Sequence, residues 1–189
     1  VLSDQTQCNP PNGKLEAFVA GGNSGYTFEW FNNAIPIGIT TSVASGLIGG
    51  NYSVLVEKNN CSVTQNAIVL DIAPDPEVTV TPTDVVNCQN LNSGMMTAQV
   101  TINGVTQPTT DYTFTWYFYD NTTLTRGSQI PGASGPTVTG LTSGYYEVVA
   151  TNTSSQCASL PVVQDVKNTT VNPVVTLAEL APQTSCDPA

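Results

Sequence analysis

Hydrophobic and polar positions alternate with the period of a β-strand in several short stretches of the chain. In residues 14–19 every second residue is apolar, and residues 95–102 repeat this pattern. Residues 26–30 and 112–118 place an aromatic side chain at every second position. A period of two indicates strands with one buried face. Because no long stretch is rich in helix-forming residues, the pattern predicts an all-β chain.

The same landmarks occur twice along the chain, which predicts two tandem modules. A Y-T-F-x-W sequence spans residues 26–30 and 112–116, and an L-x-x-G-x-Y-x-V sequence spans 47–54 and 141–148. Each copy also has a cysteine before its first landmark and another after its last. These cysteines are Cys8 and Cys61 in the first copy, and Cys88 and Cys157 in the second.

A third copy begins near the end of the sequence. Residues 173–177 followed by Cys186 resemble residues 76–80 followed by Cys88. We therefore expect a first module over residues 1–73 and a second over 74–169. Residues 170–189 would be the opening strand of a truncated third module in a longer parent protein.

Each predicted module has the marks of an immunoglobulin-like Greek-key β-sandwich. Trp30 and Trp116 lie on mid-module strands, where such folds bury a tryptophan. Tyr52 and Tyr146, within the L-x-x-G-x-Y-x-V sequences, match a tyrosine corner, in which the hydroxyl bonds to the backbone of the preceding loop. We expect about seven strands per module, with these four residues in the cores.

The cysteines follow the repeat, and we predict one disulfide per module, Cys8–Cys61 and Cys88–Cys157. By the loop-closure model each bridge adds roughly 4 kcal/mol of stability. Disulfides require an oxidising compartment, which predicts an extracellular, cell-surface protein. A zinc site is not expected, because the chain has no histidine and no close cysteine pair. Cys186 is left unpaired.

The charge balance excludes several classes of partner. The formal net charge is −10, with only 4 Lys and Arg residues, and these are scattered. Nucleic acids require clustered cations, so they are excluded as partners. Direct membrane insertion is not expected, because no apolar run approaches the roughly 20 residues of a membrane span. The N-terminal residues have neither the basic region nor the apolar stretch of a signal peptide, so we do not expect one in this sequence.

Catalysis is not expected. The absence of histidine removes the usual general base and the Ser-His-Asp and Cys-His arrangements. Two carboxylates would suffice for a glycosidase. The candidate acids lie at strand positions predicted to face solvent, and they include Glu16, Glu29, Glu57 and Glu147.

An acidic group surrounds the predicted junction between the modules and raises the question of calcium. Its members are Asp71, Asp75, Glu77 and Asp84. Calcium binds carboxylate and carbonyl oxygens and stiffens some tandem arrays at such junctions. The alternative is a solvated acidic linker stiffened by Pro74 and Pro76. The spacing matches no defined calcium loop, which favours the linker and a protein without cofactors.

Four aromatic residues are predicted to lie opposite the core face of their strands. They are Phe18, Phe31, Tyr117 and Tyr119. Exposed rings on a sheet can stack on sugars, which makes this set a possible ligand face. The alternatives are that the rings cover the core of the longer second module or a module interface.

The combined order of landmarks, C…G…GG…Y-T-F-x-W…G-L…G-x-Y-x-V…C, resembles the SprB-type repeats of giant Bacteroidota cell-surface adhesins. The resemblance covers most of both modules. The second module departs from it, because residues 103–110 replace Gly21-Gly22. The resemblance implies a surface filament of the gliding-motility type, exported by type IX secretion, that contacts a polysaccharide, a substratum or another cell.

The sequence is compatible with three functions. In the preferred one the modules are spacers of an adhesin or surface filament, contact neighbouring repeat modules and make weak, multivalent contacts. The second is a carbohydrate-binding accessory module of a secreted enzyme. The third is a self-assembling extracellular fibre subunit, in which residues 170–180 add a β-strand to the second module or to the next chain.

Overall fold

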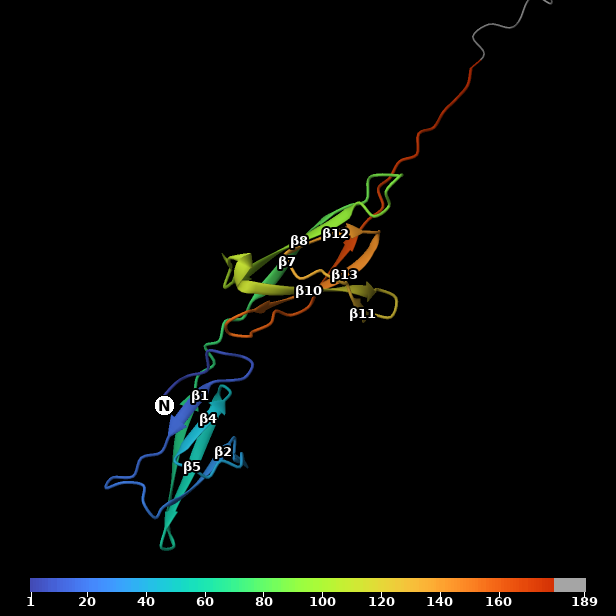
Figure 1. Ribbon diagram of the computed structural model, residues 1–189. Helices are drawn as coiled ribbons and strands as arrows, with labels where there is room; N and C mark the ends of the chain where they lie inside the picture. The colour runs from blue at the N-terminus through green and yellow to red at the C-terminus, as the bar shows by residue number, and fades with distance from the viewer. Residues whose placement is uncertain (179–189) are drawn as a thin grey trace, which may run out of the picture.

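In the computed structural model, which describes residues 1–178, the two sets of alternating stretches fold as two β-sandwiches placed end to end (Figure 1). The only helical element in this part of the chain is the short 3₁₀ turn η1, Thr109–Asp111. Among the described residues, no helix has the length and hydropathy needed to cross a membrane. The all-β prediction is confirmed.

The first module consists of two facing antiparallel sheets. One sheet pairs β1 with β4, and the other has the order β3-β2-β5-β6. Its strands are β1 (Gly13–Glu16), β2 (Thr27–Asn32), β3 (Ile35–Pro36), β4 (Val43–Leu47), β5 (Gly50–Lys58) and β6 (Cys61–Val69).

The second module repeats this arrangement with additional strands. Its sheets have the orders β12-β8-β7, with β9 paired to β8, and β11-β10-β13-β14. Its strands are β7 (Glu77–Thr83), β8 (Gly94–Ile102), β9 (Val105–Thr106), β10 (Tyr112–Asp120), β11 (Thr125–Gln129), β12 (Thr137–Leu141), β13 (Gly144–Asn152) and β14 (Val162–Val166). In the described residues, the first module has no strand in the position of β7.

Each sandwich has its own hydrophobic core built around the predicted tryptophan. Trp30 is 2% exposed and Trp116 is fully buried. A buried indole N–H needs an acceptor, and both rings find one in a backbone carbonyl. Trp30 Nε1 donates to Thr41 O at 2.9 Å and Trp116 Nε1 to Gly135 O at 3.0 Å. The predicted core positions of both tryptophans are confirmed.

Both modules contain the predicted tyrosine corner. The Tyr52 hydroxyl donates to Ile48 O at 2.9 Å, and the Tyr146 hydroxyl donates to Thr142 O at 3.0 Å. Both rings are buried. Burial disfavours the phenolate, and it raises the pKa of Tyr52 above its ordinary value. The corner thus closes the loop before β5 and before β13 in the same way.

The segments that precede β1 and β8 are also structurally equivalent. Gln5 N donates to Leu70 O and Val85 N donates to Lys167 O, each at 2.9 Å. Each segment also forms a parallel bridge with the chain just after the last strand of its module, Gln5 with Asp71 and Val85 with Asn168. Cys8 and Cys88, each three residues further on, therefore occupy equivalent positions.

Four sequence-based expectations about single strands or residues are corrected by the structure. The stretch 14–19 was expected to be one strand, but β1 ends at Glu16. Phe118 was expected in the core and is 45% exposed, while Glu147 was expected to face solvent and is 5% exposed. Residues 171–178, the described part of the predicted third-module strand, form no strand.

Candidate functional site

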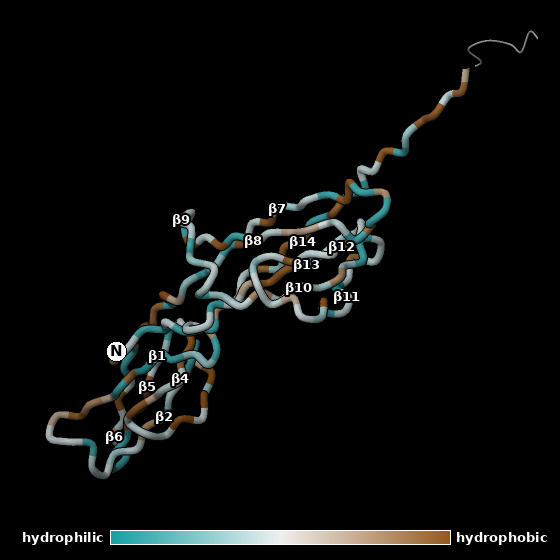
Figure 2. The backbone as a smooth tube through the Cα atoms, turned by 45° about the horizontal axis from the view of Figure 1, so that its top comes forward, coloured by the Kyte–Doolittle hydropathy of each residue, from teal (hydrophilic) through white to brown (hydrophobic). Residues whose placement is uncertain are grey.

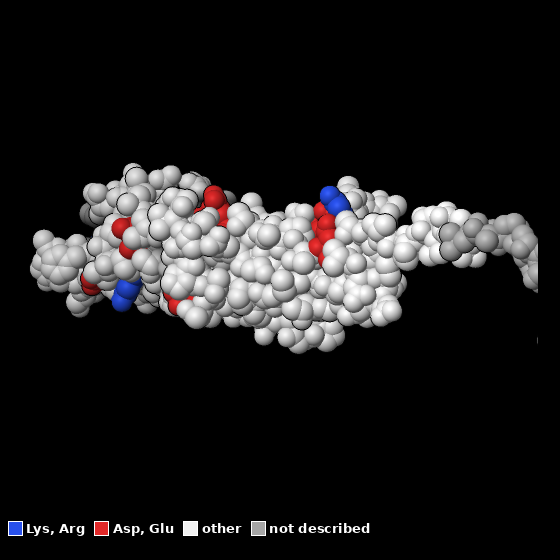
Figure 3. All heavy atoms as spheres, turned by 90° about the horizontal axis from the view of Figure 1, so that it is seen from above, with Lys and Arg blue, Asp and Glu red and all other residues white. Residues whose placement is uncertain are grey.

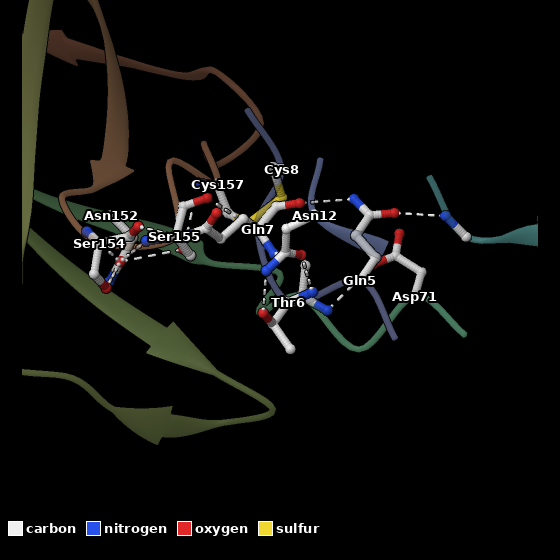
Figure 4. Close-up of a disulfide and its surroundings, with 12 residues drawn as sticks. Gln5, Thr6, Gln7, Cys8, Asn12, Asp71, Asn152, Ser154, Ser155 and Cys157 are labelled. Atoms are coloured by element: carbon white, nitrogen blue, oxygen red, sulfur yellow. Dashed lines mark hydrogen bonds between the residues drawn. A yellow bond between two sulfur atoms is a disulfide. The ribbon is translucent and has the colours of Figure 1, made fainter. Parts of the chain in front are cut away.

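A disulfide connects the two modules. Cys8, from the segment before β1, bonds to Cys157, from the loop between β13 and β14, with their Cα atoms 4.9 Å apart (Figure 4). The two cysteines are 149 residues apart in sequence. Cys157 is 1% exposed. The modules are therefore linked covalently twice, by the peptide chain between β6 and β7 and by this bridge.

The predicted pairs Cys8–Cys61 and Cys88–Cys157 are wrong. Cys61 and Cys88 are exposed free thiols, and Cys186 lies outside the described residues. Antiparallel geometry is the physical reason. Cys8 lies at the Val69 end of β6 and Cys61 at its other end, eight residues or about 26 Å away at about 3.3 Å per residue. Disulfides require Cα atoms within about 7 Å.

The loop that carries Cys157 is organised by one asparagine side chain. Asn152 Oδ1 accepts backbone N–H groups from Ser154 at 3.0 Å and from Ser155 at 2.9 Å. In the same turn, Ser155 O accepts the backbone N–H of Cys8 at 2.9 Å. Gln7 Nε2 adds a long contact to Ser154 O at 3.5 Å. One backbone hydrogen bond and one side-chain contact therefore cross the junction beside the disulfide.

The segment before β1 is held just as firmly to the first module. Gln5 is 5% exposed, and its Oε1 accepts the Gly49 N–H at 2.6 Å. Asn12 Oδ1 accepts the N–H groups of Thr6 at 2.8 Å and Gln7 at 3.1 Å. Figure 4 shows these side chains lining one continuous strip up to the disulfide. The segment that carries Cys8 is therefore fixed to the first module by hydrogen bonds from three side chains or backbone groups on either side of it.

The acidic residues proposed for calcium do not assemble into a site. Asp71 Oδ1 accepts the N–H of Ala73 at 3.1 Å, and Asp84 Oδ1 accepts the N–H of Lys167 at 2.8 Å. Asp75 and Glu77 precede or begin β7, whereas Asp84 follows its last residue. The length of the strand separates them. Among residues 1–178 no group of three potential metal ligands comes together.

Two of the four predicted ligand-face aromatics lie together on the second module. Tyr117 and Tyr119 project from the outer face of the β11-β10-β13-β14 sheet, where Tyr119 lies opposite Tyr145. Tyr145 is 41% exposed and was missed by the sequence analysis. Its alternation with buried Tyr146 was the signal that places it on the outer face.

An ion pair lies next to these tyrosines. The Arg126 guanidinium lies over the Tyr117 ring, 4.2 Å from its centroid, and forms an ion pair with the buried Glu147 carboxylate. The cation–π contact and the ion pair hold Tyr117 in one orientation. We call Tyr117, Tyr119 and Tyr145 the tyrosine face.

The other two predicted aromatics do not join this face. Phe31 is half-buried on β2 of the first module, and Phe18, 78% exposed, follows β1. The predicted ligand set is therefore divided between modules. Charged groups do not mark another site on the surface displayed in Figure 3, where they are few and separated by broad uncharged areas.

No protein-family model and no curated protein matches the sequence. Among solved structures, the chain is similar to the three N-terminal domains of the outer capsid protein Hoc of bacteriophage RB49, with 16% identity and a TM-score of 0.38. That match covers 87% of this chain and 55% of the phage chain, so this chain spans about half its length.

Two further solved structures contain tandem modules. The fibronectin(III)-like modules of Clostridium thermocellum CbhA match over 95% of this chain and 96% of theirs, with 13% identity and a TM-score of 0.34. Immunoglobulin domains 1–5 of Sidekick-1 match over 78% of this chain and 33% of theirs, with 16% identity and a TM-score of 0.30.

Proposed function

We propose that this chain is a stiff spacer of tandem modules in a secreted cell-surface adhesin or surface filament. The motif resemblance to SprB-type repeats supports a filament of the gliding-motility type, exported by type IX secretion. The Cys8–Cys157 bridge, which spans the junction between the modules, is the observation that carries the proposal. Because disulfides persist in oxidising compartments, the bridge also supports an extracellular location.

The mechanical argument follows from the two covalent links. A single peptide linker allows neighbouring domains to bend and twist about it, and relative motion is the default for small interfaces. The Cys8–Cys157 bridge adds a second fixed point on a segment that Gln5 holds to Gly49, in the turn between β4 and β5. Two separate attachment points oppose both bending and twisting. A row of such modules projects a distant binding end away from a cell surface.

The decisive experiment measures the spread of orientations between the modules. Dyes placed on β5 and on β10 report this spread by single-molecule energy transfer. We expect a narrow distribution for the oxidised chain and a broad one for Cys8→Ser, because only the bridge is removed. Cys61→Ser is the matched control, since it replaces an exposed free thiol. Equal widths in all three proteins would overturn the spacer proposal.

A second candidate function is carbohydrate binding at the tyrosine face. Flat rings held by the Arg126–Glu147 pair favour stacking on the faces of sugar rings. This supports the reading of the chain as an accessory module of a secreted enzyme. The test is affinity electrophoresis in soluble polysaccharides. Tyr119→Ala should abolish retardation, and Thr113→Ala, an exposed change on the same strand, should preserve it. Absence of retardation in every polysaccharide for the wild-type chain would reject this candidate.

A further inference from the structure

The larger sheet of the first module has a hollow on its surface, where the strands β2, β5 and β6 run side by side (Figure 2). The hollow has a volume of about 440 Å³ and opens to solvent. Ligand pockets in proteins have volumes of about 300–1,000 Å³, so this one has room for a small group. Its lining includes Asn33, Ala34, Asn51, Ser53, Asn66 and Ile68.

The hollow lies on the face of the sheet that points away from the core. On β5 the buried residues Tyr52 and Val54 alternate with Asn51 and Ser53, which therefore point outward. The neighbouring β6 adds Asn66, which is paired with Ser53. The floor of the hollow is therefore the outward surface of the sheet.

Three exposed amides supply most of the polar lining. They belong to Asn33, Asn51 and Asn66. A side-chain amide carries N–H donors beside a carbonyl acceptor, and a hydroxyl group both donates and accepts. One amide can therefore bind two neighbouring hydroxyls of one sugar ring. Ile68, 56% exposed, adds an apolar wall for the C–H groups of such a ring.

A series of hydrogen bonds holds one side of the hollow in place. The Asn33 N–H donates to Asn51 O at 3.1 Å, and Asn33 Nδ2 donates to Asn32 Oδ1 at 3.0 Å. Asn32 Nδ2 in turn donates to the hydroxyl of Tyr52, the corner tyrosine, at 3.3 Å. Because these bonds order Asn33 before a ligand arrives, binding loses less side-chain entropy.

The turn beside the hollow carries a side chain where the backbone favours glycine. Ala34 has a φ angle of 67°, in the left-handed region that alanine rarely adopts. The two-residue turn between β8 and β9 has Gly104 at the same place, with a φ of 76°. Strained backbone is concentrated at ligand sites. The methyl group of Ala34 lines the hollow, so the strained residue contributes to its wall.

The hollow occupies the position that the tyrosine face has in the second module. The strand registers agree, because each corner tyrosine pairs with the residue two positions after the buried tryptophan of its module. Asn51, next to Tyr52, therefore corresponds to Tyr145, next to Tyr146. Both modules thus present ligand-type side chains at the same place, amides in the first and aromatic rings in the second.

The charges on this face disfavour acidic ligands. None of the described residues that line the hollow is charged. Glu29 and Glu57 are exposed further along the same face of β2 and β5. The formal net charge of the chain is −10. Because like charges in a contact cost binding energy, polymers of uronic acids or sulfated sugars are disfavoured and neutral sugars are not.

We propose that this hollow binds a neutral sugar unit of an extracellular polysaccharide. The asparagine amides hold pairs of neighbouring hydroxyl groups, and Ile68 packs against the C–H groups of the ring. The site is separate from the carbohydrate candidate on the tyrosine face, and it rests neither on that candidate nor on the stiff-spacer proposal. An open hollow binds weakly, and tandem modules add such weak contacts together.

The first test follows the side-chain amide signals of Asn51 and Asn66 by NMR in the intact oxidised chain. The probes are neutral tetrasaccharides of glucose, mannose, galactose and xylose, with tetragalacturonate as the acidic control. We expect at least one neutral probe at millimolar concentration to shift both signals in a saturable way, and tetragalacturonate to leave them unchanged. No shift with any neutral probe, or equal shifts with tetragalacturonate, would overturn the proposal.

Matched substitutions then identify the groups that bind. Asn51→Asp and Asn66→Asp keep the shape of the side chain but replace its N–H donors with a carboxylate oxygen. Each should weaken binding of the responsive probe about fivefold or more, as expected for a lost hydrogen bond. Thr64→Ala, an exposed change on β6 outside the hollow, should bind within about twofold of the wild type. Equal affinities of all four proteins would refute the site.

Failure of this site is distinguishable from failure of the earlier proposals. In Tyr119→Ala the shifts at Asn51 and Asn66 should persist, because the two sites lie on different modules. Retardation that depends on Tyr119, without shifts at the hollow, would remove the hollow and keep the tyrosine face. Shifts at the hollow together with equal orientation spreads in the Cys8→Ser experiment would remove only the stiff spacer.

Discussion

Gly94 provides a direct test of how closely the second sandwich is packed. A Cβ atom at this position would lie 2.7 Å from Leu141 O and 2.7 Å from Val166 Cγ1. Both distances are shorter than real Cβ contacts, and both neighbours belong to strands of the core. The φ angle of Gly94 is outside the left-handed region, so alanine adds steric overlap without backbone strain.

The magnitude of the Gly94→Ala effect is the difference of two terms. Overpacking a filled core costs about 1–3 kcal/mol. Alanine also restricts the unfolded chain, which stabilises the fold by about 0.4–1 kcal/mol. The expected net loss is about 1–2 kcal/mol. In a domain of about 100 residues, each kcal/mol changes the Tm by about 4–8 °C. We therefore expect the Tm of the second module to fall by about 5–15 °C.

Gly135→Ala is the matched control in the same module. A Cβ there meets nothing within 4 Å, and its φ is also outside the left-handed region. Its Tm should stay unchanged or rise slightly. Calorimetry of the oxidised chain measures both variants, and Gly13→Ala, with Leu47 O at 2.5 Å from the added atom, identifies the transition of the first module. Equal Tm values for Gly94→Ala and Gly135→Ala would refute the packing argument.

Three other predictions concern single interactions. Tyr52→Phe should cost the first module about 1 kcal/mol in urea unfolding, because the bond to Ile48 O is lost. Because burial raises the pKa of Tyr52, its contribution to the free energy of unfolding should be fully present below pH 10.0 and should be lost as the pH rises through the folded-state pKa. In Tyr52→Phe this decline of stability with pH should be smaller. Arg126→Met alone should destabilise the second module more than Arg126→Met combined with Glu147→Leu, because the single change leaves a buried carboxylate unpaired. A double-mutant cycle by urea unfolding measures this difference in the free energy of unfolding.

Local patterns predicted the elements whose partners are also local or repeated. Alternation located β8, whose Met96, Ala98 and Val100 are 0–2% exposed. The tyrosine corners follow from a motif of eight residues, because the hydroxyl and its acceptor are only four residues apart. The all-β class and both cores could therefore be predicted without knowledge of distant contacts.

Expectations that depended on distant contacts were less reliable. The alternation in residues 14–19 continues to Val19, but β1 ends at Glu16, which pairs with Val43, the first residue of β4. In the second module β8 lies between β12 and β7 and remains regular for 9 residues. Glu147 alternates like a solvent-facing residue, yet Arg126 covers it from β11. A contact with a side chain from another strand cannot be seen in the hydrophobic alternation of a single strand.

The cysteine pairing shows what a tandem repeat does and does not determine. Repetition identifies Cys8 with Cys88 and Cys61 with Cys157 as equivalent positions, but it is equally compatible with bonds inside a module and bonds between neighbours. Strand length distinguishes the two. Tyr52 marks the end of β5 that lies near Cys8, whereas Cys61 pairs with Lys58 at the other end, six residues or about 20 Å along the strand. Cysteines at opposite ends of a module cannot meet within it. They can meet only across a junction, so a bond between modules leaves one thiol at each end of the pair for the next neighbour.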